Sequence, residues 1–341
     1  MYMNCPEEPA KGIRPPSGAG SFILAALVLF ILAGPALPMF ADETASGGEG
    51  STAFNIAGIQ LEISPELYAS EAHFISEMDQ QISGLLEKEA ADLIVFPEYT
   101  SAFFPAFMLP NRILTSEQAT LDQIAAHIRN RFPAESIRDF LVSQSSRDTM
   151  DRIWGGLARK HSVAILAGSY FAAHPGSRGT ELRNRSILYN HHGNAVYSQD
   201  KVYLTEFERS ILGLTPGRLW EARPIEYRGH TLAVTICRDS FFPAWEERLG
   251  KVDFWIDIKA NGTEYDAEQA EVFAEALPRR ILDGPAEEGM TVCLTGNFLE
   301  LFWEGYSSVI RESDSGNIIY LSRSDTPRDQ DIIRYTLEQG P

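Results

Sequence analysis

Three residues of different chemical type lie far apart in the chain and could act together on one substrate carbon. Glu98 occurs in VFPEY, Lys201 in QDKVYLTEFER and Cys237 in VTICRDSFFPAWEERL. A thiol nucleophile needs a base that takes its proton and later returns it through water, and it needs a positive group beside the developing oxyanion. Glutamate, lysine and cysteine supply these three roles, so the set indicates covalent catalysis.

The thiol lies where two patterns meet. Thr231 to Ile236 is apolar and β-branched, which predicts a buried strand, and Phe241 to Leu249 has helical spacing. At a helix N-terminus the unpaired N–H groups and the dipole would lower the pKa of Cys237 well below about 8.5. The N–H groups that follow it could also bind an oxyanion. The alternative is a small buried residue at the end of a core strand.

The other two residues have ordinary alternatives as well. Glu98 follows the apolar stretch Asp92 to Phe96, and ligand sites in α/β proteins favour the carboxyl ends of strands, but a solvated loop carboxylate would fit too. Lys201 precedes the charged residues Glu206 and Glu208, so it could belong to a solvated, salt-bridged segment.

Strand and helix patterns alternate along the chain, which predicts one α/β domain whose sheet faces are covered by helices. The expected strands are Asn55–Leu61, Asp92–Phe96, Val163–Tyr170, Ser186–Tyr189, Thr231–Ile236, Phe254–Ile258, Thr291–Thr295 and Ser307–Ile310. The expected helices are Glu66–Lys88, Asp148–Lys160, Phe241–Leu249 and Ala267–Leu282. A turn at His174 to Gly179 predicts that Ser186–Tyr189 pairs back as a hairpin.

Composition narrows the class of partner. The chain has 341 residues, 44% of them hydrophobic and 22% charged, with 47 acidic against 29 basic residues and a net charge of −18. This acidic balance argues against a nucleic-acid partner, which would require a basic face. A small-molecule substrate is expected instead.

The first 41 residues resemble a secretory signal peptide. Lys11 and Arg14 precede the apolar run Phe22 to Ala33, and small or turn-forming residues follow. Twelve apolar residues are short for a membrane span, which needs about 20. We expect cleavage after Ala41, a flexible lead over residues 42–52 and a periplasmic or extracellular protein; an uncleaved membrane anchor is the alternative.

The number and spacing of the cysteines and histidines indicate neither a disulfide-stabilised scaffold nor a metal site. Cys5 would leave with the signal, and Cys237 and Cys293 allow at most one disulfide. Cys293 is expected in a core strand. His191 and His192 lack a third ligand at suggestive spacing, and no nucleotide-binding fingerprint occurs. We therefore expect neither a metal nor a cofactor.

The segments VFPEY, QDKVYLTEFE and TICRDSFFP, in this order, resemble the three signature segments of the nitrilase superfamily, the carbon–nitrogen hydrolases. The resemblance runs from Asn55 to Ser322 and includes the stretches NIAGIQLE, EEGMTVCLTGN and GYSSVIRESDSGNII. It implies a single-domain, four-layer α-β-β-α sandwich over about residues 53–325, with residues 326–341 as a C-terminal tail. It also implies a homodimer or higher homo-oligomer.

The resemblance also implies a role for each site residue. Cys237 would attack the substrate carbon and form a thioester, Glu98 would act as general base and acid, and Lys201 would stabilise the tetrahedral intermediate. Glu208 would position Lys201 and the substrate. Arg238 would give its backbone N–H to the oxyanion hole.

Two features depart from the family pattern. Arg238 follows the nucleophile where an aromatic residue is common, so its side chain could face the pocket and favour an anionic or polar substrate. The interval from Glu98 to Lys201 is long because of an excursion at about residues 101–146, which is either the mouth of a site or a packing subdomain.

These observations predict an exported amidase that cleaves non-peptide carbon–nitrogen bonds through a Cys237 acyl-enzyme. Two alternatives keep the triad, namely acyl transfer to an amine and hydrolysis of a nitrile. The alternative from another class is a non-enzymatic binding protein on the same fold.

Overall fold

The computed structural model describes residues 53–338 except 117–118, 132–145, 175–180 and 285, and these residues belong to one compact unit. The expected signal segment and flexible lead, the last residues of the chain and part of the 101–146 excursion lie outside the described residues. No helix in the described part of the chain has the length and apolar character needed to cross a membrane.

Thirteen strands form one continuous sheet whose main path runs β5-β4-β3-β2-β1-β9-β8-β7-β6. The first five strands in chain order are β1 (Phe54–Ile63), β2 (Leu93–Phe96), β3 (Ala164–Ala173), β4 (Leu182–Tyr189) and β5 (Ala195–Asp200). The remaining eight are β6 (Ile225–Tyr227), β7 (His230–Ile236), β8 (Phe254–Lys259), β9 (Glu288–Phe298), β10 (Leu301–Trp303), β11 (Ser308–Glu312), β12 (Ile318–Arg323) and β13 (Asp331–Leu337).

The sheet folds over on itself at β1 and β9. These two strands pair only over Leu61–Ile63 and residues 294–296, whereas the rest of β1 pairs with β2 and β13. The two halves therefore face each other across an inner core that contains Ile56 and Val95 from one half and Val234 and Ile256 from the other. This arrangement makes the two central layers of the expected sandwich.

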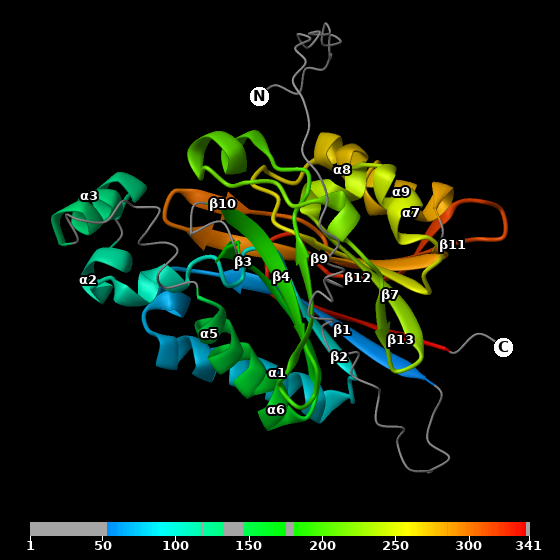
Figure 1. Cartoon of the computed structure of the whole chain (residues 1–341), viewed down its shortest axis with the longest axis horizontal. Helices are drawn as coiled ribbons and strands as arrows, with labels where there is room; N and C mark the ends of the chain where they lie inside the picture. Colours follow the sequence, from blue (N-terminus) through cyan, green and yellow to red (C-terminus); the bar gives the residue numbers. More distant parts are fainter. Residues whose placement is uncertain (1–52, 117–118, 132–145, 175–180, 285, 339–341) are drawn as a thin grey trace, which may run out of the picture. The chain divides into compact units, whose positions relative to one another are not determined.

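Helices cover the outer face of each half (Figure 1). The first half is covered by α1 (Glu71–Lys88) and by α5 (Arg147–Met150), a π-helical turn at Asp151–Gly155 and α6 (Gly156–His161). The second half is covered by α7 (Ala244–Leu249), α8 (Ala267–Ala274) and α9 (Leu277–Asp283). The layers follow the order α-β-β-α, and the predicted nitrilase-type sandwich is confirmed.

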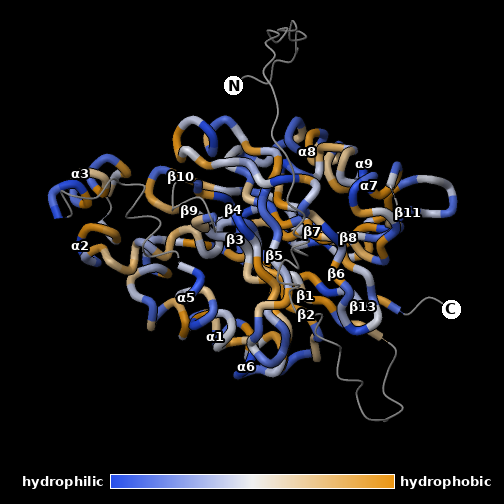
Figure 2. The backbone as a smooth tube through the Cα atoms, viewed as in Figure 1, coloured by the Kyte–Doolittle hydropathy of each residue, from blue (hydrophilic) through white to orange (hydrophobic). Residues whose placement is uncertain are grey.

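The amphipathic pattern of α1 shows why it packs as it does. Phe74, Met78, Ile82 and Leu85 recur at helical spacing and are fully buried against the first half of the sheet. Ser70 begins the helix by accepting a hydrogen bond from the His73 N–H at 3.1 Å. Figure 2 shows the resulting change between hydrophilic and hydrophobic residues along the outer helices.

Three sequence predictions need correction. The helix expected over Glu66–Lys88 is a short 3-10 turn, Glu66–Tyr68, followed by α1. The helix expected over Ala267–Leu282 is two helices, α8 and α9, because the chain leaves helical geometry at Ala276 and Pro278 begins a new turn. Part of the expected C-terminal tail is β13, which pairs antiparallel with β1 from Phe54 to Gln60.

The described part of the 101–146 excursion contains a 3-10 turn at Phe104–Met108 and the helices α2 (Asn111–Leu114) and α3 (Leu121–Arg131). Phe104 is fully buried and contacts Phe74 of α1 edge to face, with ring centroids 4.9 Å apart. The beginning of the excursion therefore packs into the outer core of the first half.

Candidate active site

Most of the polar residues of the site come from one edge of the sheet. The pairs β1–β2, β2–β3, β1–β9, β8–β9 and β7–β8 are all parallel, so these strands end at the same edge. Glu98 follows β2, and Cys237 follows β7. Lys201 follows β5 and reaches the same edge because β3–β4 and β4–β5 are antiparallel. The fold therefore brings three distant segments together, as expected for a ligand site of an α/β protein.

Lys201 lies at the centre of the cluster and is 1% exposed. Its Nζ is 2.8 Å from Glu98 Oε1 and 2.8 Å from Glu208 Oε2, and both carboxylates are fully buried. Burial alone would lower the pKa of Lys201, but the surrounding carboxylates, Glu98 first and then Glu208, outweigh it and raise the pKa. The residue is therefore a permanently charged ammonium.

Glu208 is held by neighbours that favour its ionised form. It lies in a π-helical turn, Phe207–Ile211, and its Oε2 accepts from the Thr205 N–H at 2.8 Å. Its Oε1 accepts from the Tyr99 hydroxyl at 2.8 Å and from Asn184 Nδ2 at 2.9 Å. Burial would raise the pKa of Glu208, but Lys201 and these hydrogen bonds outweigh it and lower the pKa.

Glu98 shares the same lysine and has the opposite shift. Its Oε1 accepts from Asn184 Nδ2 at 2.8 Å, and its Oε2 accepts from the Ala260 N–H at 3.0 Å. Burial raises its pKa; Lys201 opposes that shift and the charge of Glu208 reinforces it. Of two carboxylates on one ammonium, Glu98 is therefore the one that readily takes up a proton.

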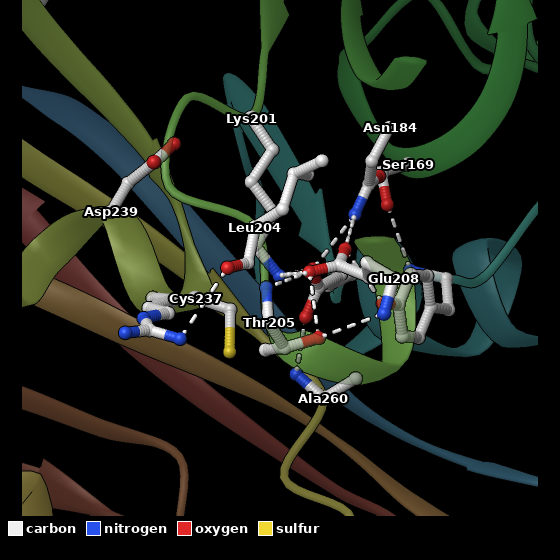
Figure 3. Close-up of polar contacts among 12 residues, drawn as sticks. Ser169, Asn184, Lys201, Leu204, Thr205, Glu208, Cys237, Asp239 and Ala260 are labelled. Carbon is white, nitrogen blue, oxygen red and sulfur yellow. Dashed lines mark hydrogen bonds and ion pairs between the residues drawn. The ribbon is translucent and has the colours of Figure 1, made fainter. Parts of the chain in front are cut away.

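Cys237 opens a short 3-10 turn, Cys237–Phe241, directly after β7, in a left-handed conformation with φ = 53°. Such a φ is uncommon for a residue other than glycine and is a feature of strained functional turns. Its thiol lies near enough to the Glu98 carboxyl for each group to shift the pKa of the other. Figure 3 shows the thiol in the same close-up as Lys201, Glu208, Asn184 and Ala260.

The expectation of a lowered thiol pKa was wrong. Burial and the nearby charge of Glu98 raise the pKa of Cys237 to about 12, although Lys201 and Lys259 act in the opposite direction. No α-helix begins at Cys237; α7 starts at Ala244. A neutral thiol beside a carboxylate needs that carboxylate as its base.

Asp239 joins the Cys237 turn to the segment that carries Lys201. This buried carboxylate accepts from the N–H groups of Val202 at 3.0 Å and Tyr203 at 2.8 Å. Burial raises its pKa to about 7, against the effect of these hydrogen bonds and of Lys201. The connection fixes Lys201 and Cys237 relative to each other.

The sequence reasoning did not find Asn184, Tyr99 or Asp239. Asn184 lies near the start of β4, within a run of buried residues, and its side-chain amide nitrogen donates to both glutamates. A polar residue at a buried strand position was the available signal, but its meaning depends on the pairing of β4 with β3.

The Arg238 side chain is half-buried and lies against the Lys201 segment. Its guanidinium donates to the Leu204 carbonyl at 3.4 Å and lies 5.9 Å from the centre of the Phe242 ring. Its expected contact with a substrate, and the use of its backbone N–H in an oxyanion hole, stay predictions.

The structure also places the second described cysteine, the histidine pair and the aromatic residues that follow the nucleophile. Cys293 is fully buried in β9, and both described cysteines are free thiols. His191 and His192 contact each other, and no group of three metal-ligating residues occurs in the described part of the chain. Trp245 is fully buried, whereas Phe241 and Phe242 are half-buried.

Residues 55–245, more than half of the chain, match the model of the carbon-nitrogen hydrolase family. The chain therefore belongs to the carbon–nitrogen hydrolase family. No curated protein matches it significantly.

Solved structures of an amidase of the nitrilase superfamily from Nesterenkonia sp. AN1 have the same fold. Its cysteine-to-serine variant is 16% identical, with a TM-score of 0.58 over 84% of this chain and 92% of that chain. A cysteine-to-alanine variant in complex with butyramide is 17% identical, with a TM-score of 0.59 over 84% and 91%. A variant with the acetamide moiety of fluoroacetamide on its active-site cysteine is 18% identical, with a TM-score of 0.60 over 85% and 92%.

Proposed function

We propose that this carbon–nitrogen hydrolase is an amidase that acts through a Cys237 thioester. The observation that carries the proposal is the buried cluster in which Lys201 Nζ lies 2.8 Å from both Glu98 and Glu208, with the Cys237 thiol beside Glu98 and the pKa of Glu98 raised. This arrangement supplies one proton-accepting carboxylate beside a thiol and one fixed cation. Support comes from a solved amidase variant in complex with butyramide, a short amide, and from another whose active-site cysteine carries the acetamide moiety of fluoroacetamide, which shows a nucleophilic cysteine in that protein.

In the first half-reaction, Cys237 Sγ forms a bond to the amide carbon while its proton passes to Glu98. The carbonyl π electrons move to the oxygen, which becomes an oxyanion. The ammonium of Lys201 has three N–H donors. Glu98 and Glu208 occupy two of these donors, and the described residues supply no acceptor for the third. The third donor is available to the oxyanion. Collapse of the intermediate breaks the C–N bond, and the proton on Glu98 goes to the leaving nitrogen.

In the second half-reaction, water replaces the amine. Glu98 takes a proton from the water as its oxygen bonds to the thioester carbon. The carbon–sulfur bond then breaks, the acid leaves, and Cys237 regains its proton from Glu98. The same carboxylate therefore acts as base and acid in both halves.

A panel of short amides, with released ammonia or amine as the readout, tests the proposal. We expect turnover of at least one short amide by the wild type and by Cys293→Ala, the matched control at the other described cysteine. We expect no turnover by Cys237→Ala. Release of ammonia at the normal rate by Cys237→Ala would refute the proposal. Release that requires an added amine acceptor would indicate acyl transfer, and turnover of nitriles alone would indicate nitrile hydrolysis.

We also propose that the protein is exported, on the basis of the charged, apolar and small-residue stretches of residues 1–41. Expression of the full chain, followed by cell fractionation and mass measurement, tests this. A mature chain that begins at Asp42 outside the cytoplasm is expected. A full-length chain in the membrane fraction would indicate an uncleaved anchor, and a full-length chain in the cytoplasm would contradict export.

A homo-oligomer, most simply a dimer, remains a proposal that rests on family resemblance. Light scattering of the purified protein tests it directly. A single species with the mass of one chain at micromolar concentration would refute it.

A further inference from the structure

A second buried lysine lies behind the nucleophile. Lys259, the last residue of β8, is 2% exposed, and its Nζ is 2.7 Å from Asp257 Oδ2. It also donates to Ser240 Oγ at 3.0 Å and to the carbonyl oxygen of Cys237 at 3.2 Å. An ion pair and two hydrogen bonds therefore surround this ammonium, and all of these close partners belong to the protein.

The Cys237 carbonyl is held from two sides. It accepts from Ser240 Oγ at 2.8 Å as well as from Lys259. The Asp257 carboxylate behind Lys259 is fully buried, which makes the ammonium a fixed part of the core. Two donors on one carbonyl fix the orientation of the peptide plane between Cys237 and Arg238.

The orientation of that plane determines where the next N–H points. In a planar trans peptide the carbonyl and the N–H point in opposite directions. Donors that hold the Cys237 oxygen toward Lys259 therefore hold the Arg238 N–H toward the opposite side. A cation on the carbonyl also polarises the peptide and makes its N–H a stronger donor.

We propose that Lys259 is a positioning residue that orients and polarises the Cys237–Arg238 peptide, so that the Arg238 N–H serves as an oxyanion donor. This inference rests on the proposed thioester chemistry for its biological meaning. Lys201 acts on the oxyanion directly, whereas Lys259 acts only through the backbone. Weakening one oxyanion donor costs less than removing it, for which about 100- to 1,000-fold in kcat is typical, so we expect a loss of about 10- to 100-fold.

The test uses reversible addition of butyraldehyde to Cys237. The carbon–sulfur bond forms as the carbonyl π bond breaks, and the thiol proton ends on the former carbonyl oxygen, so nothing else is consumed. This adduct places an oxygen where the oxyanion would form. The stability of the adduct is measured as protection of Cys237 from methyl methanethiosulfonate. This reagent transfers a methylthio group to the thiol and releases methanesulfinate, and its reaction forms no oxyanion.

The measured quantity is the butyraldehyde concentration that halves the rate of thiol modification. In Lys259→Met we expect this concentration to be at least about ten times that of the wild type, because the oxyanion donor is weakened. Thiol modification without aldehyde is measured alongside, because Lys259 also lowers the pKa of Cys237, and the loss of protection should clearly exceed any loss of that rate. Ser240→Ala removes the other donor to the same carbonyl and leaves the ion pair intact, so a smaller loss of the same kind is expected. Lys160→Met is the matched control, since that lysine pairs with Asp79 at 2.7 Å but is 60% exposed on α6.

Unchanged protection in folded Lys259→Met would overturn the inference. If Lys259→Met does not fold, unchanged protection in Ser240→Ala would overturn it instead. A parallel loss of protection and thiol reactivity in both variants would mean a purely structural role and would also overturn it. Because this readout needs no amide turnover, a wild type that hydrolyses no amide would refute the proposed function and leave this test decisive.

Discussion

The two buried lysines of the site, Lys201 and Lys259, are the same residue type in similar surroundings but have different partners. Each is at most 2% exposed, and each forms an ion pair of 2.7–2.8 Å with a carboxylate. Lys201 has two carboxylate partners, whereas Lys259 has one carboxylate, one hydroxyl and one carbonyl. The number of acceptors, not burial or charge, distinguishes a lysine that can bind a substrate from one that only holds the backbone.

The carboxylates around the two lysines differ as well. Burial raises the pKa of Glu98 and the charge of Glu208 adds to this rise, whereas Lys201 and the hydrogen bonds to Glu208 outweigh its burial and lower its pKa. Lys259 has a single carboxylate partner, Asp257, whose pKa is raised by burial although Lys259 opposes that shift.

The largest effect is expected from Lys201→Met. It removes the cation that faces the oxyanion and leaves Glu98 and Glu208 unpaired in a buried site, so kcat/KM should fall about 1,000-fold or more. Steady-state kinetics with the best short amide measures this. A fall smaller than the one caused by Lys259→Met would contradict the distinction between the two lysines.

Glu208→Gln should lower kcat/KM by about 10- to 100-fold, because Lys201 loses one of its two anchors. It should also change the pH profile in a defined direction. Glu98 must be ionised to accept the thiol proton, so activity is lost as pH falls through its raised pKa. Removing the charge of Glu208 lowers the pKa of Glu98, so the acid limb moves to lower pH. An acid limb at the wild-type position would contradict the proposed coupling.

Asp239→Asn should change how stability depends on pH. The pKa of Asp239 is raised from 3.8 to about 7 on folding, so its contribution is fully present below pH 3.8 and is lost as pH rises through about 7. The change is at most about 1.4 kcal/mol per pH unit. Urea unfolding across this range should show a flatter slope in the variant than in the wild type. Parallel slopes would show that Asp239 has an ordinary pKa.

The smallest effect is expected from Lys160→Met. An exposed ion pair such as Lys160–Asp79 contributes about 0.2–1 kcal/mol, and it is remote from the β-strand edge that carries the site. Thermal unfolding should change little, and kcat/KM should be unchanged. A large loss of activity would show that removal of any ion-paired lysine impairs the enzyme, and it would contradict the distinct roles assigned to Lys201 and Lys259.

The fold and the central residues could be predicted because their signals are local. VFPEY and the Cys237 segment each carry an apolar strand pattern with a reactive residue at its end, and QDKVYLTEFER was identified by its resemblance to a family segment. The alternation of strands and helices then indicates a layered α/β fold in which such ends meet. The structure brings Glu98, Lys201, Glu208 and Cys237 together as expected.

The remaining features depend on contacts between distant segments. Asn184 bridges Glu98 and Glu208 across 86 and 24 residues of chain, and Lys259 reaches Cys237 across 22. The thiol pKa was predicted in the wrong direction because the sequence does not show how deeply Cys237 is buried or that Glu98 lies beside it. The strand β13 was missed because it is defined by its pairing with β1, at the other end of the domain.

The central claim is that Cys237, served by Glu98 and Lys201, carries the acyl group during turnover. Rapid acid quenching of the enzyme during turnover of a short amide, followed by peptide mass spectrometry, tests it most directly. We expect the acyl mass on the peptide that contains Cys237 and unmodified thiol at Cys293. Turnover with no acyl group on Cys237 at any quench time, together with undiminished turnover in Cys237→Ala, would contradict it.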